Sequence, residues 1–197
     1  MKKIMVGMWI ENPFFGQRTL LVKLPDESGG RSYEIEYFNH PFTGKGSQPL
    51  HFHTIYTERF IILSGKARYR LGNVELDADA GSTVILPPKI PHLHPWSISD
   101  DELHVRQIVE ANPPDIGGLN ACLNTGITFC GLASEGKINK YGLPGVLQLS
   151  VSAKSTMPVT YSAGMPISIQ RIIIGFLAAL GKMAGYRPTY SNYGEVG

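Results

Sequence analysis

The feature that most constrains the fold of this chain is a series of short segments, within residues 31–111, in which apolar and polar side chains alternate. Tyr33, Ile35 and Tyr37 are separated by glutamates, which is the period of two expected when one face of a β-strand lies in a core. Turn signals such as the Ser-Gly pair ending at Gly65 separate the segments. Similar segments lie at residues 60–63, 66–71, 74–76, 84–86 and 105–109. Many short strands without helical periods between them predict an antiparallel β-sandwich or barrel.

The pattern changes to helical spacing after the Asn-Pro-Pro sequence at residues 112–114. Leu119, Leu123 and Ile127 recur at intervals of four residues. This spacing predicts a helix that stops near Gly136.

A second helix is predicted between Pro166 and either Gly181 or Gly185. Its sequence is apolar nearly all round, so we expect it to be buried, on the barrel or at a dimer interface. A helix lying on a membrane surface is an alternative, but this one lacks the strongly charged face typical of such helices. Its longest apolar stretch, residues 172–180, is under half of the about 20 residues that span a membrane.

The composition fits one domain with an appendage. Of the 197 residues, 43% are hydrophobic and 17% are charged, which is enough apolar sequence for a real core. We therefore predict a barrel with its N-terminal strands at residues 1–111 and a helical extension packed on it at residues 112–197. With 18 basic and 16 acidic residues, the net charge of +2 gives no electrostatic reason to expect a nucleic-acid partner.

Cysteine usage predicts a reducing compartment. Cys122 and Cys130 lie eight residues apart, a separation of about 12 Å on a helix, which is too far for a disulfide. The apolar patch near the N-terminus is followed directly by Glu11 and Pro13, without the cleavage site of a signal peptide. We expect a soluble, cytoplasmic protein without a membrane span.

Three histidines and one glutamate have the spacing of a metal site. His51 and His53 are two residues apart, so both imidazoles lie on the same face of a strand. Glu58 begins the next segment, and His92 ends a later pair of strands. A metal ion needs several donors within about 2 to 2.5 Å, which the paired strands of a small barrel can supply.

The runs around these residues resemble the two sequence motifs of the cupins. The matching residues are His51, His53, Glu58 and Gly65 of the first motif and Gly81, Pro87 and His92 of the second. The resemblance implies a mainly β fold, the double-stranded β-helix or jelly-roll barrel, with a C-terminal α-helical extension. It also implies one metal ion held by His51, His53, Glu58 and His92.

Three positions depart from the cupin motifs. Lys45 and Lys89 stand where each motif has a glycine, and Trp96 stands where the second has an asparagine. None of these changes removes a ligand, so we expect altered turns and a different pocket wall. Residues 12–18 and the sequence after residue 135 resemble a group of single-domain cupins that implies no particular reaction.

His94 competes with His92 because both can face the same way. The motif spacing favours His92. His94 is then expected to orient a metal-ligating residue by a hydrogen bond, without binding the metal itself, or to lie at the exposed mouth of the pocket. The other candidate pocket residues are aromatic, with ordinary core packing as the alternative: Tyr37, Phe60, Tyr69 and Trp96. His40 and His104 have no partner in the sequence and are interpreted as structural or surface groups.

Three imidazoles and a carboxylate suit a divalent transition metal, namely Fe, Mn, Ni, Cu or Zn. Two positions stay open on an octahedral ion, where a substrate oxygen or dioxygen can bind. The leading hypothesis is a metal-dependent oxidoreductase with dioxygenase-type oxidation of a small organic molecule, ahead of isomerisation or decarboxylation. The resemblance implies that Glu58 also acts as a base and that the protein is a homodimer.

Two other hypotheses remain open at this point. The first is a non-catalytic barrel that binds or senses a small ligand, because fold does not fix function. In that case the cluster is vestigial, lining a pocket that stays empty or takes an organic molecule. The second makes the helical extension the functional, interacting part of the protein.

Overall fold

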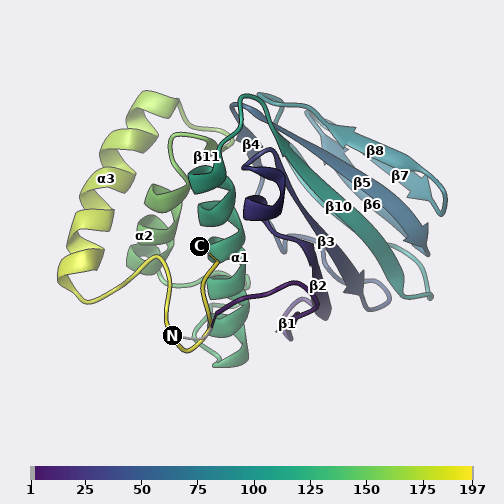
Figure 1. Ribbon diagram of the computed structural model, residues 1–197, viewed down its shortest axis with the longest axis horizontal. Helices are drawn as coiled ribbons and strands as arrows, with labels where there is room; N and C mark the ends of the chain where they lie inside the picture. The colour runs from purple at the N-terminus through teal and green to yellow at the C-terminus, as the bar shows by residue number, and fades with distance from the viewer. Residues whose placement is uncertain (1–2, 197) are drawn as a thin grey trace.

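Two antiparallel β-sheets face each other, with three α-helices beside them, in residues 3–196, the part of the chain that this computed structural model describes (Figure 1). The strands are β1 Trp9–Asn12, β2 Gln17–Lys23, β3 Ser32–Asn39, β4 His51–His53, β5 Tyr56–Ser64, β6 Lys66–Leu71, β7 Val74–Asp79, β8 Thr83–Leu86, β9 His92–Ser97, β10 Leu103–Ala111 and β11 Thr160–Ser162. The helices are α1 Ile116–Ser134, α2 Val146–Thr156 and α3 Ile167–Met183, and a 3-10 turn covers Pro25–Ser28.

The strand order within these residues is β1-β2-β3-β10-β5-β8 in one sheet and β11-β4-β9-β6-β7 in the other. The alternation seen in the sequence is the alternation of burial: every second residue of β10 is buried, from Leu103 to Ala111. On β10, Val105 is paired with Tyr37 of β3 and Ile62 of β5. The predicted β-barrel of two sheets with a helical extension is therefore confirmed.

Apolar side chains form two separate clusters. One fills the space between the two sheets and includes Phe60, Ile62 and Val105. The other lies between the six-stranded sheet and α1 and includes Tyr56 and Leu119. The space between the two clusters is where the polar residues of the candidate site lie.

The first predicted helix is confirmed as α1. The Asp115 side chain accepts a hydrogen bond from the backbone N–H of Gly118 at 2.9 Å and so caps its first turn. Gly136, with φ of +68°, follows its end. Cys122 and Cys130, both on α1, are free thiols. In the described chain only α1 has the length and hydropathy of a membrane span, but it is a core helix with Leu119 fully buried.

The second predicted helix is not buried on the barrel, and its alternative place at a dimer interface stays a prediction. This helix is α3, and it packs on α2 at the outer side of the molecule (Figure 1). Ile172, Phe176 and Met183 are 73%, 64% and 85% exposed. The contact with α2 is made at small residues: a Cβ on Gly181 would lie 2.7 Å from Val151. α2, which the sequence did not reveal, makes the main contact with α3, and α3 reaches the barrel at β11, where Gln170 bonds to the backbone of Ser162.

β11 ties the helical region to the barrel. It follows α2 in the chain but pairs with β4 in the five-stranded sheet, with Thr160 opposite His53. Strands β1 to β10 lie within residues 1–111 and the helices within residues 112–197. The division of the chain at residue 111 stays a prediction, because a strand of the second part completes a sheet of the first.

Candidate metal centre

A polar layer lies between the two apolar clusters inside the barrel. On β5 the inward side chains are Tyr56, Glu58 and Phe60, so Glu58 is flanked by one aromatic residue of each cluster. On the neighbouring strand β10, Gln107 has the same place among inward apolar residues. Glu58 is 2% exposed, which means that its charge needs partners inside the protein.

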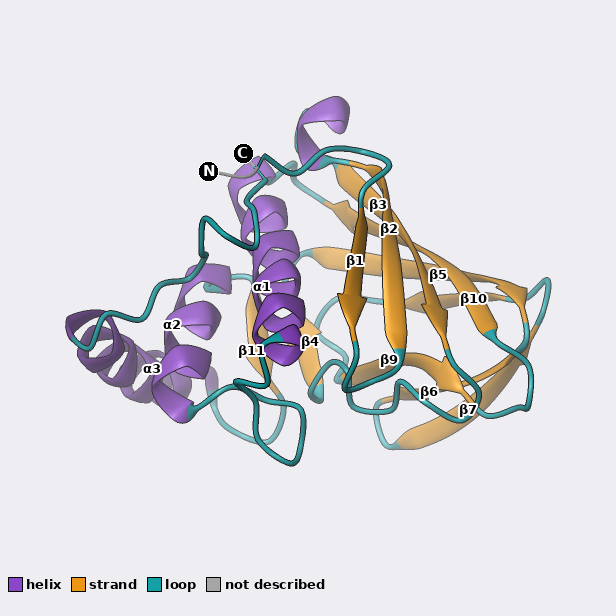
Figure 2. Cartoon of the chain, turned by 90° about the horizontal axis from the view of Figure 1, so that it is seen from below, coloured by secondary structure: helices purple, strands orange, loops and turns teal. Residues whose placement is uncertain are grey.

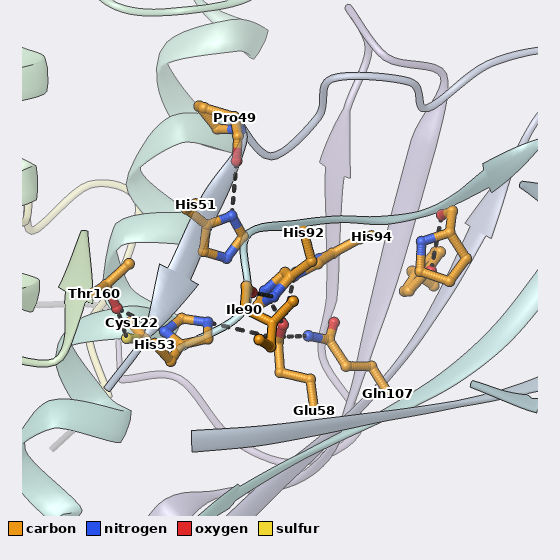
Figure 3. A network of polar contacts seen from close by, with 12 residues as sticks. Pro49, His51, His53, Glu58, Ile90, His92, His94, Gln107, Cys122 and Thr160 are labelled. Carbon is orange, nitrogen blue, oxygen red and sulfur yellow. Dashed lines mark hydrogen bonds and ion pairs between the residues drawn. The ribbon is translucent and has the colours of Figure 1, made fainter. Parts of the chain in front are cut away.

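Four histidines face this layer from the five-stranded sheet (Figure 3). His51 and His53 lie on β4, and their side chains point the same way, as the spacing of two predicts. His92 and His94 lie on β9 with the same spacing, and His92 is paired directly with His51. The two strands thus bring all four imidazoles opposite Glu58.

The carboxylate of Glu58 is the centre of the polar contacts. Its Oε2 lies 2.9 Å from Nε2 of His92 and 3.0 Å from Nε2 of His94. Its Oε1 accepts a hydrogen bond from Nε2 of Gln107 at 2.9 Å and lies 3.7 Å from Nε2 of His53. Burial would raise the pKa of Glu58, but the imidazoles of His94 and His53 hold this pKa well below its ordinary value. Glu58 is therefore a carboxylate.

Hydrogen bonds at Nδ1 of His51 and of His92 orient Nε2 of each ring toward the site. Nδ1 of His51 lies 2.7 Å from the carbonyl oxygen of Pro49, and Nδ1 of His92 lies 2.8 Å from that of Ile90. A carbonyl only accepts, so each Nδ1 carries a proton, and Nε2 is the ring nitrogen that faces the site. Burial, and then the nearby His53 and His94, lower the pKa of His51 well below its ordinary value, which keeps this ring neutral.

The arrangement fits a metal ion. Nε2 of His92 is buried and has no hydrogen-bond partner among the described residues, although a carboxylate oxygen lies close by. A buried polar nitrogen without a hydrogen-bond partner is costly, and an imidazole nitrogen in that position is a donor atom that a metal can use. One potential ligand atom from each of His51, Glu58, His92 and His94 lies within 4.8 Å of the others. These donors, imidazole and carboxylate, are those of a transition-metal site.

The structure brings all the predicted ligands into one region but groups them differently. The group within 4.8 Å contains His94 and does not contain His53. Their hydrogen bonds distinguish the two residues. Nδ1 of His53 lies 2.9 Å from Oγ1 of Thr160, which turns Nε2 inward, whereas Nε2 of His94 is itself hydrogen-bonded to Glu58. Because Glu58 is ionised, that nitrogen of His94 must donate.

Two residues of the network were not found from the sequence. Gln107 is a buried polar residue at an inward position of β10. A polar side chain among the alternating apolar residues of this strand is the local signal by which it could have been found. Thr160 has no local signal, because its role depends on the pairing of β11 with β4.

A cavity of about 220 Å³ opens beside the cluster. His51, His53, Glu58 and His94 line it, and so does Tyr37, as expected for a pocket wall. Three other aromatic candidates do not line it: Phe60, Tyr69 and Trp96. The first two pack in the apolar cluster between the sheets, and Trp96 is buried with the Lys45 ammonium 4.7 Å from its ring centre. For these three, core packing is the observed role.

The departure at Lys89 has a conformational consequence. Lys89 has φ of +68°, a left-handed conformation that favours glycine. Its backbone N–H donates to the carbonyl of His53 at 2.6 Å, so the turn before β9 is attached to β4. The turn keeps its shape with a lysine in place of glycine.

Comparison with known proteins gives a family-level result. Residues 42–109 match the family model of the cupin domain, a segment that contains Glu58 and the four histidines. No curated protein matches the sequence significantly.

Solved structures resemble the barrel with low identity. A predicted oxalate decarboxylase from Thermotoga maritima is 14% identical, with a TM-score of 0.45, and the match covers 48% of this chain and 80% of that one. A putative sugar phosphate isomerase from Acidithiobacillus ferrooxidans is 20% identical, with a TM-score of 0.42 and coverages of 54% and 68%. Oxalate decarboxylase from Bacillus subtilis is 18% identical, with a TM-score of 0.42; the match covers 53% of this chain but only 27% of that one. These likenesses do not bear on the reaction.

Proposed function

Because the chain belongs to the cupin superfamily, we propose that it is a metal-dependent enzyme that oxidises a small organic molecule with dioxygen. The observation that carries the proposal is the convergence of three histidines and Glu58 within 4.8 Å of one another, beside a cavity that Glu58 lines. In this proposal His51, His53, Glu58 and His92 hold one divalent transition metal: iron, manganese, nickel, copper or zinc.

The metal, when bound, supplies a Lewis acid and, for the redox-active ions, a carrier of electrons between substrate and dioxygen. Dioxygen is then the oxidant and also the source of the two oxygen atoms that enter the product. The reaction needs no separate reductant.

The chain's own residues orient and accept protons. Gln107 donates to Oε1 of Glu58 and His94 donates to Oε2, so the carboxylate is fixed from two sides. The proposal gives Glu58 the role of accepting a proton from a substrate hydroxyl in the cavity, because its carboxylate is ionised and lines that cavity. The apolar walls of the cavity exclude water, which strengthens these polar contacts.

Elemental mass spectrometry of protein purified without a histidine-rich tag tests the metal site. We expect one transition metal near unit stoichiometry, lost in His51→Ala and in His92→Ala. The matched control is His40→Ala, because His40 is exposed and belongs neither to the cluster nor to the lining of the cavity. Comparison of His53→Ala with His94→Ala identifies the fourth ligand: loss of metal in His94→Ala alone would replace His53 by His94 in the proposal.

Dioxygen consumption with isotopically labelled oxygen tests the reaction. We expect both labelled atoms in the product of a small organic substrate, and no consumption by Glu58→Gln. If the protein holds stoichiometric metal but converts none of the substrates offered, the result would instead favour the non-catalytic binding protein. Absence of metal after reconstitution would contradict the proposal as a whole.

The proposal includes a homodimer in the cytoplasm. Support for association through the barrel comes from Leu63 and Ile85, which are 42% and 53% exposed on strands of the six-stranded sheet. Sedimentation analysis of the wild-type protein and of Ile85→Lys tests this interface. We expect a dimer that the lysine dissociates, and a monomeric wild-type protein would contradict the proposal.

A further inference from the structure

The cavity beside the histidine cluster extends out of the barrel and into the helical region. Its lining includes Leu21 and Ile35 from β2 and β3, and also side chains from all three helices and from β11. Figure 2 shows α1, α2 and β11 side by side at the end of the sheets where β4 lies. The helices therefore form the far wall of the same cavity whose near end is Glu58.

All three helices contribute side chains to this far end. The residues from α2 and α3 recur at intervals of three or four, which is the spacing of one helical face: Leu149, Ala153 and Thr156 of α2, and Gln170 and Ile174 of α3. The residues from α1 cover a broader face: Cys122, Leu123, Thr125, Gly126, Ile127, Phe129 and Cys130.

The charge in the cavity is confined to its inner end. Among the described residues that line it there is no lysine and no arginine, and Glu58 is the one carboxylate. At the far end, the Gln170 amide is already satisfied, because it donates to the carbonyls of Ser162 and Met165. A carboxylate or phosphate at this end would be buried without a cation, which is costly.

We propose that the cavity takes an uncharged, elongated molecule whose polar end lies at the histidine cluster and whose apolar ring or chain lies between α1 and α2. That the polar end is the reacting end rests on the function proposed above. The volume of about 220 Å³ is sufficient for the apolar ring or chain of such a molecule, since an apolar cavity of about 150 Å³ binds benzene in another protein.

Gly126 makes the apolar subsite testable without disturbing the core. It lies in the middle of α1 and lines the cavity, and a Cβ added there would meet no atom within 4 Å. Gly126→Leu therefore fills the far end of the cavity, and leucine favours the helix over glycine. Gly117→Leu is the matched control, because Gly117 is also on α1 with open space around it but does not line the cavity.

The probes are phenol, 4-propylphenol and 3-(4-hydroxyphenyl)propanoate, with binding to the metal-loaded protein measured by titration calorimetry. The second adds an apolar tail to the first, and the third replaces the end of that tail by a carboxylate. We expect 4-propylphenol to bind at least about tenfold more tightly than phenol, because its tail is removed from water. The carboxylate probe is expected to bind at least about tenfold more weakly than 4-propylphenol.

Gly126→Leu is expected to reduce the preference for 4-propylphenol over phenol to about threefold or less, while Gly117→Leu retains the preference. Equal binding of the carboxylate probe, an unchanged preference in Gly126→Leu, or no binding of 4-propylphenol to the wild-type protein would overturn the inference. Metal content and dioxygen consumption are measured on the same samples. Failure of the proposed reaction then appears as missing dioxygen consumption by the metal-loaded protein with the 4-propylphenol preference intact.

Discussion

The hydroxyl of Thr160 lies 2.9 Å from Nδ1 of His53, although 107 residues separate the two in the chain. They are also opposite each other in the β4–β11 pairing. Cys122 of α1 contacts the same hydroxyl, with its Sγ 3.6 Å from Oγ1. The helical region therefore supports a residue of the candidate metal centre in addition to covering the barrel.

Replacing Thr160 by valine tests this support. The change keeps the shape of the side chain and removes the hydroxyl that orients His53, so we expect metal affinity to fall by about 10- to 100-fold. Competition with a chelator measures the change. Thr160→Ser should retain the affinity, and so should Thr156→Val, which alters a hydroxyl of the same cavity that bonds to the backbone of Ala153. Equal affinities in Thr160→Val and the wild-type protein would show that His53 is not oriented through this bond.

Gln107→Leu tests whether Glu58 depends on its hydrogen-bond donor. The substitution leaves Oε1 of a buried carboxylate without the 2.9 Å bond from Gln107. We expect the free energy of unfolding of the metal-free protein to fall by about 1 to 3 kcal/mol, measured by urea denaturation. In a Glu58→Gln background the same change should cost less, because no charge is left unpaired. An equal loss of unfolding free energy in both backgrounds would mean that Gln107 stabilises the protein independently of the charge on Glu58.

The candidate metal ligands could be predicted from the sequence, whereas the residues that hydrogen-bond to them could not. The spacing of His51, His53 and Glu58 is a local pattern, and the structure brings these residues into one region, although His53 is not in the group whose ligand atoms lie within 4.8 Å. Gln107 shows locally only as a polar residue among apolar ones. Thr160 acts through a strand pairing between distant segments, which no local pattern records.

The helical region shows the same limit. α1 was predictable because its apolar residues repeat at helical intervals. α2 was missed because Leu147, Leu149 and Val151 lie two residues apart, as in a strand, and its first turn has no side-chain cap. The exposure of α3 was misjudged for a related reason: its inward neighbour is α2, so its relation to the barrel depended on a helix that had not been recognised.

Lys89→Gly is expected to stabilise the protein. A lysine at φ of +68° is strained by roughly 1 kcal/mol or more, and glycine removes that strain while increasing the freedom of the unfolded chain. The expected net gain is about 0.5 to 1 kcal/mol in the free energy of unfolding, measured in urea. Gly81→Ala is the converse control, because Gly81 has φ of +87° with open space around it, and should lose a similar amount. Destabilisation by Lys89→Gly would mean that the lysine side chain contributes more than its backbone costs.

The thiol of Cys130 predicts how stability depends on alkaline pH. Burial raises the pKa of Cys130 to about 12 from an ordinary value of 9.0. Between these values the folded protein keeps a proton that the unfolded chain loses, so the free energy of unfolding falls as the pH rises from about 9. The slope for one such thiol is at most about 1.4 kcal/mol per pH unit. Urea denaturation at pH 8 to 10.5 should show a shallower decline in Cys130→Ala than in the wild-type protein. Ser134→Ala, on the same helix and without a titrating group, should leave the slope unchanged, and an unchanged slope in Cys130→Ala would mean that this thiol ionises in the folded protein as it does in the unfolded one.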